Sequence, residues 1–95
     1  MSMYSKLRDL RVRNTDDESL GRVIDLIIRK KNGEIIELVV EPDKDIELED
    51  KLPTDDADNI ILPFSAAELM GNEIVIDMKK LRVLLMKQEL RKGTE

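Results

Sequence analysis

Short apolar runs separated by polar turns dominate this chain and predict a sheet of short antiparallel strands. Val, Ile and Leu alternate with charged residues in most of these runs, which is the period of a half-buried strand. The expected strands are 7–13, 20–30, 34–41, 59–63 and 73–76, with 45–49 as a sixth, short edge strand. The pattern therefore predicts a mainly β domain of five to six strands.

The second expected strand is apolar on both faces. Val23, Asp25 and Ile27 alternate with Ile24, Leu26 and Ile28. A strand with two apolar faces is typical of a closed or strongly curved sheet, because water then reaches neither side. Gly21, near its start, indicates a bulge or a close approach of two backbones.

Turn residues separate the expected strands. Asn32-Gly33 predicts a hairpin whose two central residues have positive φ, because Asn and Gly tolerate that conformation best. The polar segment 14–19 is expected to be a solvated loop, since it lacks the ligand spacing and the glycine of a calcium loop. Ser65 is expected to cap a brief helical turn that runs to Leu69.

A helix closes the chain. Asp77 is a good N-cap, the helix is expected from Met78 to about Arg91, and Gly93 ends it. At 100° per residue its apolar side chains form two opposite stripes. One stripe contains Met78, Leu81, Leu84 and Leu85, and the other contains Val83, Met86 and Leu90.

Only one of the two stripes can pack on the sheet of so small a domain. The first stripe is expected to do so, which leaves Val83, Met86 and Leu90 as candidate partner-binding residues. Alternatively, the acidic segment before the fourth strand could fold over this second stripe, or the stripe could simply be exposed surface.

Composition excludes most kinds of chemistry. The 95 residues contain no Cys and no His, which removes thiol nucleophiles, ordinary zinc sites and imidazole proton transfer. The four glycines are too far apart for a phosphate-binding loop. We therefore expect no catalytic residues, no cofactor-binding residues and no metal site.

Charge and hydropathy bear on partners and location. The net charge is −5, and the segment 41–59 alone carries nine acidic against two basic residues. An acidic domain repels phosphate groups, so nucleic acid is not an expected partner. No apolar run is long enough to span a bilayer, and the N-terminus lacks the apolar core of a signal peptide. We expect a cytoplasmic protein without direct membrane insertion.

Several motifs together resemble the PRC-barrel family. They are Leu20-Gly21-Arg22-Val23-Ile24-Asp25, Gly33 with Leu38-Val39-Val40, and Ile61-Leu62-Pro63-Phe64-Ser65-Ala66 followed by Gly71-Asn72-Glu73-Ile74-Val75-Ile76. The resemblance covers most of residues 7–76. It implies a small β-barrel of five to six antiparallel strands at 1–77, with an acidic loop at 42–58. The C-terminal helix at 78–92 and the tail at 93–95 lie outside the family signature.

The resemblance also implies functions. PRC-barrel domains occur in the reaction-centre H subunit, in the ribosome-maturation factor RimM and as short stand-alone archaeal proteins, and none of these uses the barrel for catalysis. Some stand-alone proteins act in archaeal cell division with SepF-type and FtsZ-type proteins. The leading hypothesis is therefore a non-enzymatic adaptor, a homodimer that binds a SepF-type protein or another PRC-barrel protein, recruited to the division site. The alternative is a RimM-like accessory that binds a ribosomal protein or an RNA-processing complex.

Overall fold

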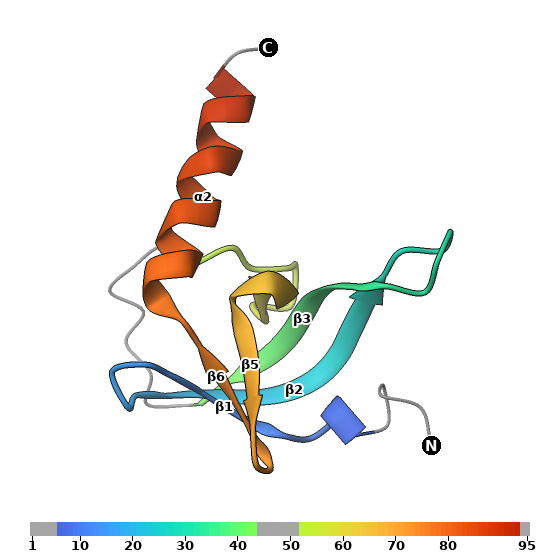
Figure 1. Cartoon of the computed structure of the whole chain (residues 1–95), viewed down its shortest axis with the longest axis vertical. Coiled ribbons are helices and arrows are strands. Elements are labelled where there is room, and N and C mark those ends of the chain that lie inside the picture. Colours follow the sequence, from blue (N-terminus) through green and yellow to red (C-terminus); the bar gives the residue numbers. More distant parts are fainter. Residues whose placement is uncertain (1–5, 44–51, 94–95) are drawn as a thin grey trace.

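Six strands form one curved sheet, with a helix at its C-terminal end (Figure 1). The computed structural model describes residues 6–43 and 52–93, with side chains described as far as Lys87. The strand order across the sheet is β4-β3-β2-β1-β6-β5. The elements are β1 (Arg11–Asn14), β2 (Ser19–Ile28), β3 (Ile35–Pro42), β4 (Ile60–Pro63), η1 (Phe64–Ala66), β5 (Ala67–Met70), β6 (Glu73–Ile76) and α2 (Met78–Gly93).

The sheet is mixed, so the expectation of wholly antiparallel strands was wrong for one pair. β1 and β6 run parallel, with Val12 opposite Ile74, whereas the other four pairs are antiparallel. β5 and β6 form an antiparallel hairpin, and its second strand, β6, is the one that pairs with β1. β6 runs in the same direction as β1, so this pair is parallel. Thr15 N then donates a hydrogen bond to Ile76 O at 3.1 Å, which aligns the ends of the two strands.

Strand pairing does not close the sheet into a barrel. β4 and β5 are its two edges, and within residues 6–43 and 52–93 they do not pair with each other. Curvature instead brings the apolar faces together around one core, which η1 and the first turns of α2 complete. The largest fully buried side chains of this core are Val12, Val23, Leu38, Val40, Ile60, Leu62, Ile74, Ile76 and Leu81.

A β-bulge changes the alternation of β2. Val23 pairs with Val40 but Asp25 pairs with Val39, so Ile24 is the extra residue. Beyond the bulge Leu26, and not Asp25, faces the core. The far end of the strand is half-exposed at Ile27 and Ile28, so the prediction that both faces are buried was wrong.

At Gly21 the backbones of β2 and β3 approach each other closely. A Cβ atom at this position would overlap the carbonyl oxygen of Glu41 and lie 3.0 Å from the Cα of Pro42. This confirms the predicted close approach of backbones. The predicted hairpin between the same strands is present. Of its two expected central residues, Gly33 has positive φ (71°) and Asn32 does not. The reason is that the loop spans residues 30–33 and is longer than a two-residue turn.

The predicted helical turn ending at Leu69 is wrong after its first residues. η1 covers only Phe64–Ala66, without a side-chain cap, and Ala67–Met70 is the edge strand β5. β5 pairs with β6 around the Gly71-Asn72 turn, with Met70 opposite Glu73. Pairing with β6 outweighs a weak local helical preference, because alternate residues of β5 gain ladder hydrogen bonds to β6.

Only part of the predicted acidic loop 42–58 is described. The expected edge strand at 45–49 lies outside the described residues. Thr54 forms an isolated bridge with Ile60, and Ile61 N donates to Pro53 O at 2.8 Å. Asp55 accepts hydrogen bonds from the backbone amides of Ala57 and Asn59, each at 2.9 Å. The hydrogen bond from Asn59 N is the main reason that the pKa of Asp55 lies below its ordinary value.

Candidate protein-interaction surfaces

Asp77 fixes the start of α2. Its Oδ1 accepts hydrogen bonds from Lys79 N at 3.0 Å and Lys80 N at 3.2 Å, which confirms the predicted N-cap. Its own amide donates to Ala66 O at 2.8 Å. Met78 N also lies 3.4 Å from Thr15 Oγ1. The helix start is therefore held by η1 on one side and by the turn after β1 on the other.

One apolar stripe of α2 packs on the body of the domain, as predicted. Met78 and Leu81 are buried, and Leu84 and Leu85 are partly buried against the core. Burial decreases along the helix because α2 rises away from the sheet, and only its first turns lie beside the body (Figure 1). The helix is thus anchored at its N-terminal end and projects from the body of the domain beyond its first turns.

The opposite stripe is exposed. Val83 is 51% exposed and Met86 is 62% exposed, the highest value among the large apolar side chains described. The side chain of Leu90, the third predicted interface residue, lies outside the described part of the chain. Val83 and Met86 are three residues apart and therefore share one helix face. The structure brings these two together on one exposed face.

The exposed stripe of α2 lies in a basic setting. The helix contains six Lys and Arg residues and one Glu, a net charge of +5. Because the whole chain carries −5, the remaining residues carry −10. Lys79, Lys80 and Lys87 are exposed and form no ion pair with any described residue. Apolar side chains flanked by unpaired cations fit a partner with an acidic surface.

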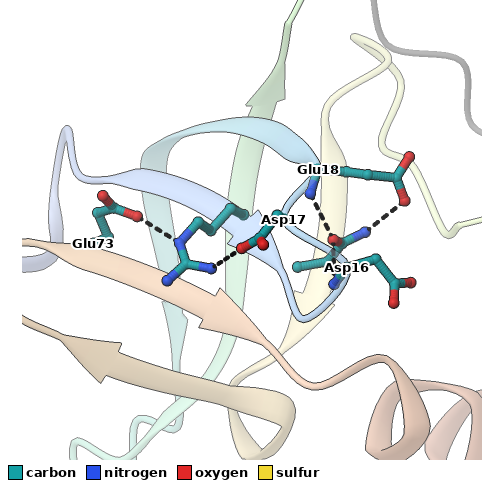
Figure 2. Close-up of polar contacts among 6 residues, drawn as sticks. Asp16, Asp17, Glu18 and Glu73 are labelled. Carbon is teal, nitrogen blue, oxygen red and sulfur yellow. Dashed lines mark hydrogen bonds and ion pairs between the residues drawn. The ribbon is translucent and has the colours of Figure 1, made fainter.

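Residues 15–18 between β1 and β2 are exposed, as predicted for a solvated loop, but the buried side chain of Asn14 organises the turn. Asn14 is 3% exposed, and its Oδ1 accepts hydrogen bonds from Asp16 N and Glu18 N, each at 2.9 Å (Figure 2). Asn14 Nδ2 donates to Glu18 Oε1 at 3.1 Å. An Asn that leads a polar turn can fold the backbone in this way, and this was the signal in the sequence.

Arg13 connects this turn to β6. Its Nε donates to Glu73 Oε2 at 2.7 Å, and its Nη1 lies 2.9 Å from Asp17 Oδ1 (Figure 2). Two of the three carboxylates of the turn are therefore directed at different partners, Asp17 at Arg13 and Glu18 at Asn14. In the part of the chain that the structure describes, no three acidic side chains gather where they could hold a metal ion.

A second polar cluster joins β1, β2 and the residue after β3. Asp43 accepts a hydrogen bond from Ser19 Oγ at 2.6 Å and lies 2.8 Å from Arg11 Nη2. Arg11 Nη2 also donates to Ser19 Oγ at 2.8 Å. The Ser19 hydroxyl first, and the Arg11 guanidinium second, hold the pKa of Asp43 below its ordinary value of 3.8.

The structure also exposes apolar residues that sequence reasoning did not single out. On the edge strand β5, Leu69 is 54% and Met70 50% exposed. A pocket of about 80 Å³ opens beside them, lined by Leu7, Phe64, Ala67, Glu68, Leu69 and Ile74. The Gly71-Asn72 turn was the signal, because it places Ala67–Met70 symmetrically opposite Glu73–Ile76.

The fold and these surfaces define a class of protein, a small curved β-sheet domain with an anchored, projecting helix. Within the described residues, no helix is long and apolar enough to cross a membrane. In a comparison with models of known protein families, the family model of the PRC-barrel domain matches residues 1–84. The chain belongs to the PRC-barrel family. A comparison with curated proteins finds no significant match.

Proposed function

We propose that this PRC-barrel protein is a non-enzymatic adaptor that binds another protein through the exposed face of α2. The observation that carries the proposal is the pair Val83 and Met86, both more than half exposed on a helix whose other stripe anchors it to the core. Fully burying such a side chain contributes about 1.5–3 kcal/mol before the cost of association. Together with Leu90 and the surrounding lysines, the face can support a specific contact.

A second copy of the chain is the simplest partner, and we propose a homodimer. Charge decides how the copies meet. Two α2 helices side by side would bring two helices of net charge +5 together, which is repulsive. The rest of each copy carries −10 and offers the complementary surface. The proposed dimer therefore packs α2 of each copy against the acidic body of the other, a two-fold arrangement that closes on itself.

The larger assembly that we propose is an archaeal cell-division complex. The support is the resemblance of this PRC-barrel domain, with its C-terminal helix, to the stand-alone PRC-barrel proteins that work with SepF-type and FtsZ-type proteins. In this role the protein binds a SepF-type protein or another PRC-barrel protein and is recruited to the division site.

The adaptor proposal is tested by removing the exposed apolar stripe. The variant Val83→Ser, Met86→Gln, Leu90→Gln is expected to stay folded, because Val83 and Met86 are exposed and Leu90 shares their helix face, and to be monomeric in light scattering. The matched control is Ile27→Thr, Ile28→Thr, Ile36→Thr, which removes three half-exposed apolar residues at the β2–β3 hairpin. A control that dissociates while the α2 variant keeps the mass of the native protein would contradict the proposal.

The division assignment has its own experiment. The tagged protein is used as bait in lysate of the source organism, and the α2 triple variant is the control bait. Recovery of SepF-type and FtsZ-type proteins by the native chain, and not by the variant, is the expected result. Recovery of ribosomal proteins instead would contradict the division role and favour a RimM-like one.

A further inference from the structure

The two edges of the sheet differ in how far they are covered. β4 is flanked by the segment before it, because Thr54 bridges Ile60 and Ile61 N donates to Pro53 O. Beside β5, in contrast, no strand of residues 6–43 or 52–93 pairs on the outer side. Natural edge strands are protected by short length, charged side chains, proline or a bulge. β5 is four residues long with the sequence Ala-Glu-Leu-Met, so Glu68 is its single charge and it has no lysine or proline.

The apolar pocket lies on the core side of this open edge. Leu69 pairs with Ile74, and Ile74 is buried in the core, so Leu69 is on the inner face of the sheet. The pocket beside them has a volume of about 80 Å³. A cavity of about 150 Å³ accommodates benzene, so this one is suited to a side chain of Val size.

Glu68 provides the polar feature of the same edge. It contributes to the lining of the pocket, it is exposed, and its carboxylate makes no hydrogen bond or ion pair with the described residues. Because Glu68 and Leu69 are adjacent in β5, their side chains point to opposite faces. A strand added beside β5 would alternate in the same way, with one side chain in the pocket and its neighbours beside Glu68.

We propose that the outer edge of β5 captures an extended, basic segment of a partner protein. The segment adds a seventh strand to the sheet, places a Val-sized side chain in the pocket, and sets a Lys or Arg beside Glu68. Main-chain hydrogen bonds supply affinity, and the pocket with Glu68 supplies selectivity. This surface is separate from the exposed stripe of α2, so the two contacts can be tested independently.

The test uses synthetic peptides and the full chain labelled with ¹⁵N. The probe is the capped heptapeptide Lys-Val-Lys-Val-Lys-Val-Lys, and binding is followed by amide chemical shifts. The expected result is a saturable shift centred on Ala67–Met70 and on Leu7 and Phe64. The same peptide with its five central amides N-methylated cannot pair with an edge and is expected not to bind. A Glu-Val-Glu-Val-Glu-Val-Glu peptide is expected to bind weakly or not at all.

Charge reversal at two sites separates capture at β5 from general attraction to an acidic protein. Glu68→Lys is expected to weaken peptide binding about fivefold. The control is Asp16→Lys, because the Asp16 carboxylate is exposed and has no partner among the described residues. This control is expected to change peptide binding by less than about twofold. Equal binding of the N-methylated peptide, or equal loss in both variants, would overturn the proposal. Contacts between β5 strands of two copies in peptide-free protein would also overturn it, because the edge would then be occupied.

Discussion

Asn14 and Glu18 are joined by three hydrogen bonds. Asn14 N donates to Glu18 O at 3.0 Å, Glu18 N donates to Asn14 Oδ1 at 2.9 Å, and Asn14 Nδ2 donates to Glu18 Oε1 at 3.1 Å. This pair closes the turn between β1 and β2. The next residue of the turn, Thr15, bonds to Ile76 and Met78, so the same turn also positions the start of α2.

Replacing this asparagine is expected to destabilise the protein. Asn14→Ala leaves the amides of Asp16 and Glu18 without their acceptor and empties a buried side-chain position, so it is expected to lower the free energy of unfolding by about 1–3 kcal/mol. The measurement is urea unfolding followed by circular dichroism. Asn32→Ala is the control, because Asn32 makes the same kind of bond to Glu34 N at an exposed turn. Equal losses in the two variants would show that burial of Asn14 adds nothing.

Gly21 and Gly71 are required for different reasons, Gly21 because there is no space for a Cβ atom and Gly71 because its φ is positive. Gly21→Ala is expected to cost about 3 kcal/mol, because the added Cβ overlaps the Glu41 carbonyl and rigid backbone cannot yield. Gly71→Ala is expected to cost about 1 kcal/mol, because its φ is +63° but the space around it is open. Thermal melts measure both losses. A larger effect at Gly71 would contradict the close packing of β2 against β3.

The two stripes of α2 are expected to respond differently to truncation. Leu81 is 1% exposed, so Leu81→Ala is expected to lower the free energy of unfolding by about 2–5 kcal/mol. Met86→Ala is expected to change it by less than about 0.5 kcal/mol at concentrations where the protein is monomeric. Urea unfolding of dilute samples measures both. Reversed magnitudes would mean that the opposite face of the helix packs on the core.

The Asp43 cluster predicts part of the acid sensitivity. The folded-state pKa of Asp43 is lowered, so its carboxylate stabilises the fold above the ordinary pKa of 3.8, and this contribution is lost as pH falls through the lower folded-state value. Asp43→Asn is therefore expected to flatten the decline in stability below about pH 4. Melting temperatures between pH 6 and pH 2.5 measure the decline.

A matched substitution serves as the control for that series. Asp16→Asn removes an exposed carboxylate that has no side-chain partner among the described residues. Its melting temperatures are expected to fall with pH as steeply as those of the native protein. If Asp43→Asn follows the same curve, the bonds from Ser19 and Arg11 do not stabilise the folded protein.

Local patterns were sufficient where neighbouring residues decide the structure. Asp77 begins the helix because its own carboxylate accepts the first amides. β6 was predicted residue for residue, and the 3.6-residue period separated Leu81 from Val83 and Met86. The family motifs likewise identified the domain, whose model matches residues 1–84.

Local sequence patterns did not predict the structure where pairing with distant segments of the chain decides it. The bulge at Ile24 depends on how β2 must bend over the core, and it turned Leu26 inward in place of Asp25. Ala67–Met70 has no strong strand signal of its own and becomes β5 only because β6 offers a partner. The parallel pairing of β1 with β6 joins residues about 60 positions apart, a relationship that no local window contains.

The sequence by itself determined the mainly β domain, the closing helix with its two stripes, and the residue types that exclude thiol and imidazole chemistry. Periodicity and composition act through neighbours, so they can be read along the chain. The tertiary structure alone decided that the sheet formed by the described residues is mixed and not closed into a barrel, that Asn14 is buried, and that Leu69 and Glu68 line a pocket at the edge strand β5. These features depend on which strands pair and how the sheet curves, and both are set by burial of the whole core.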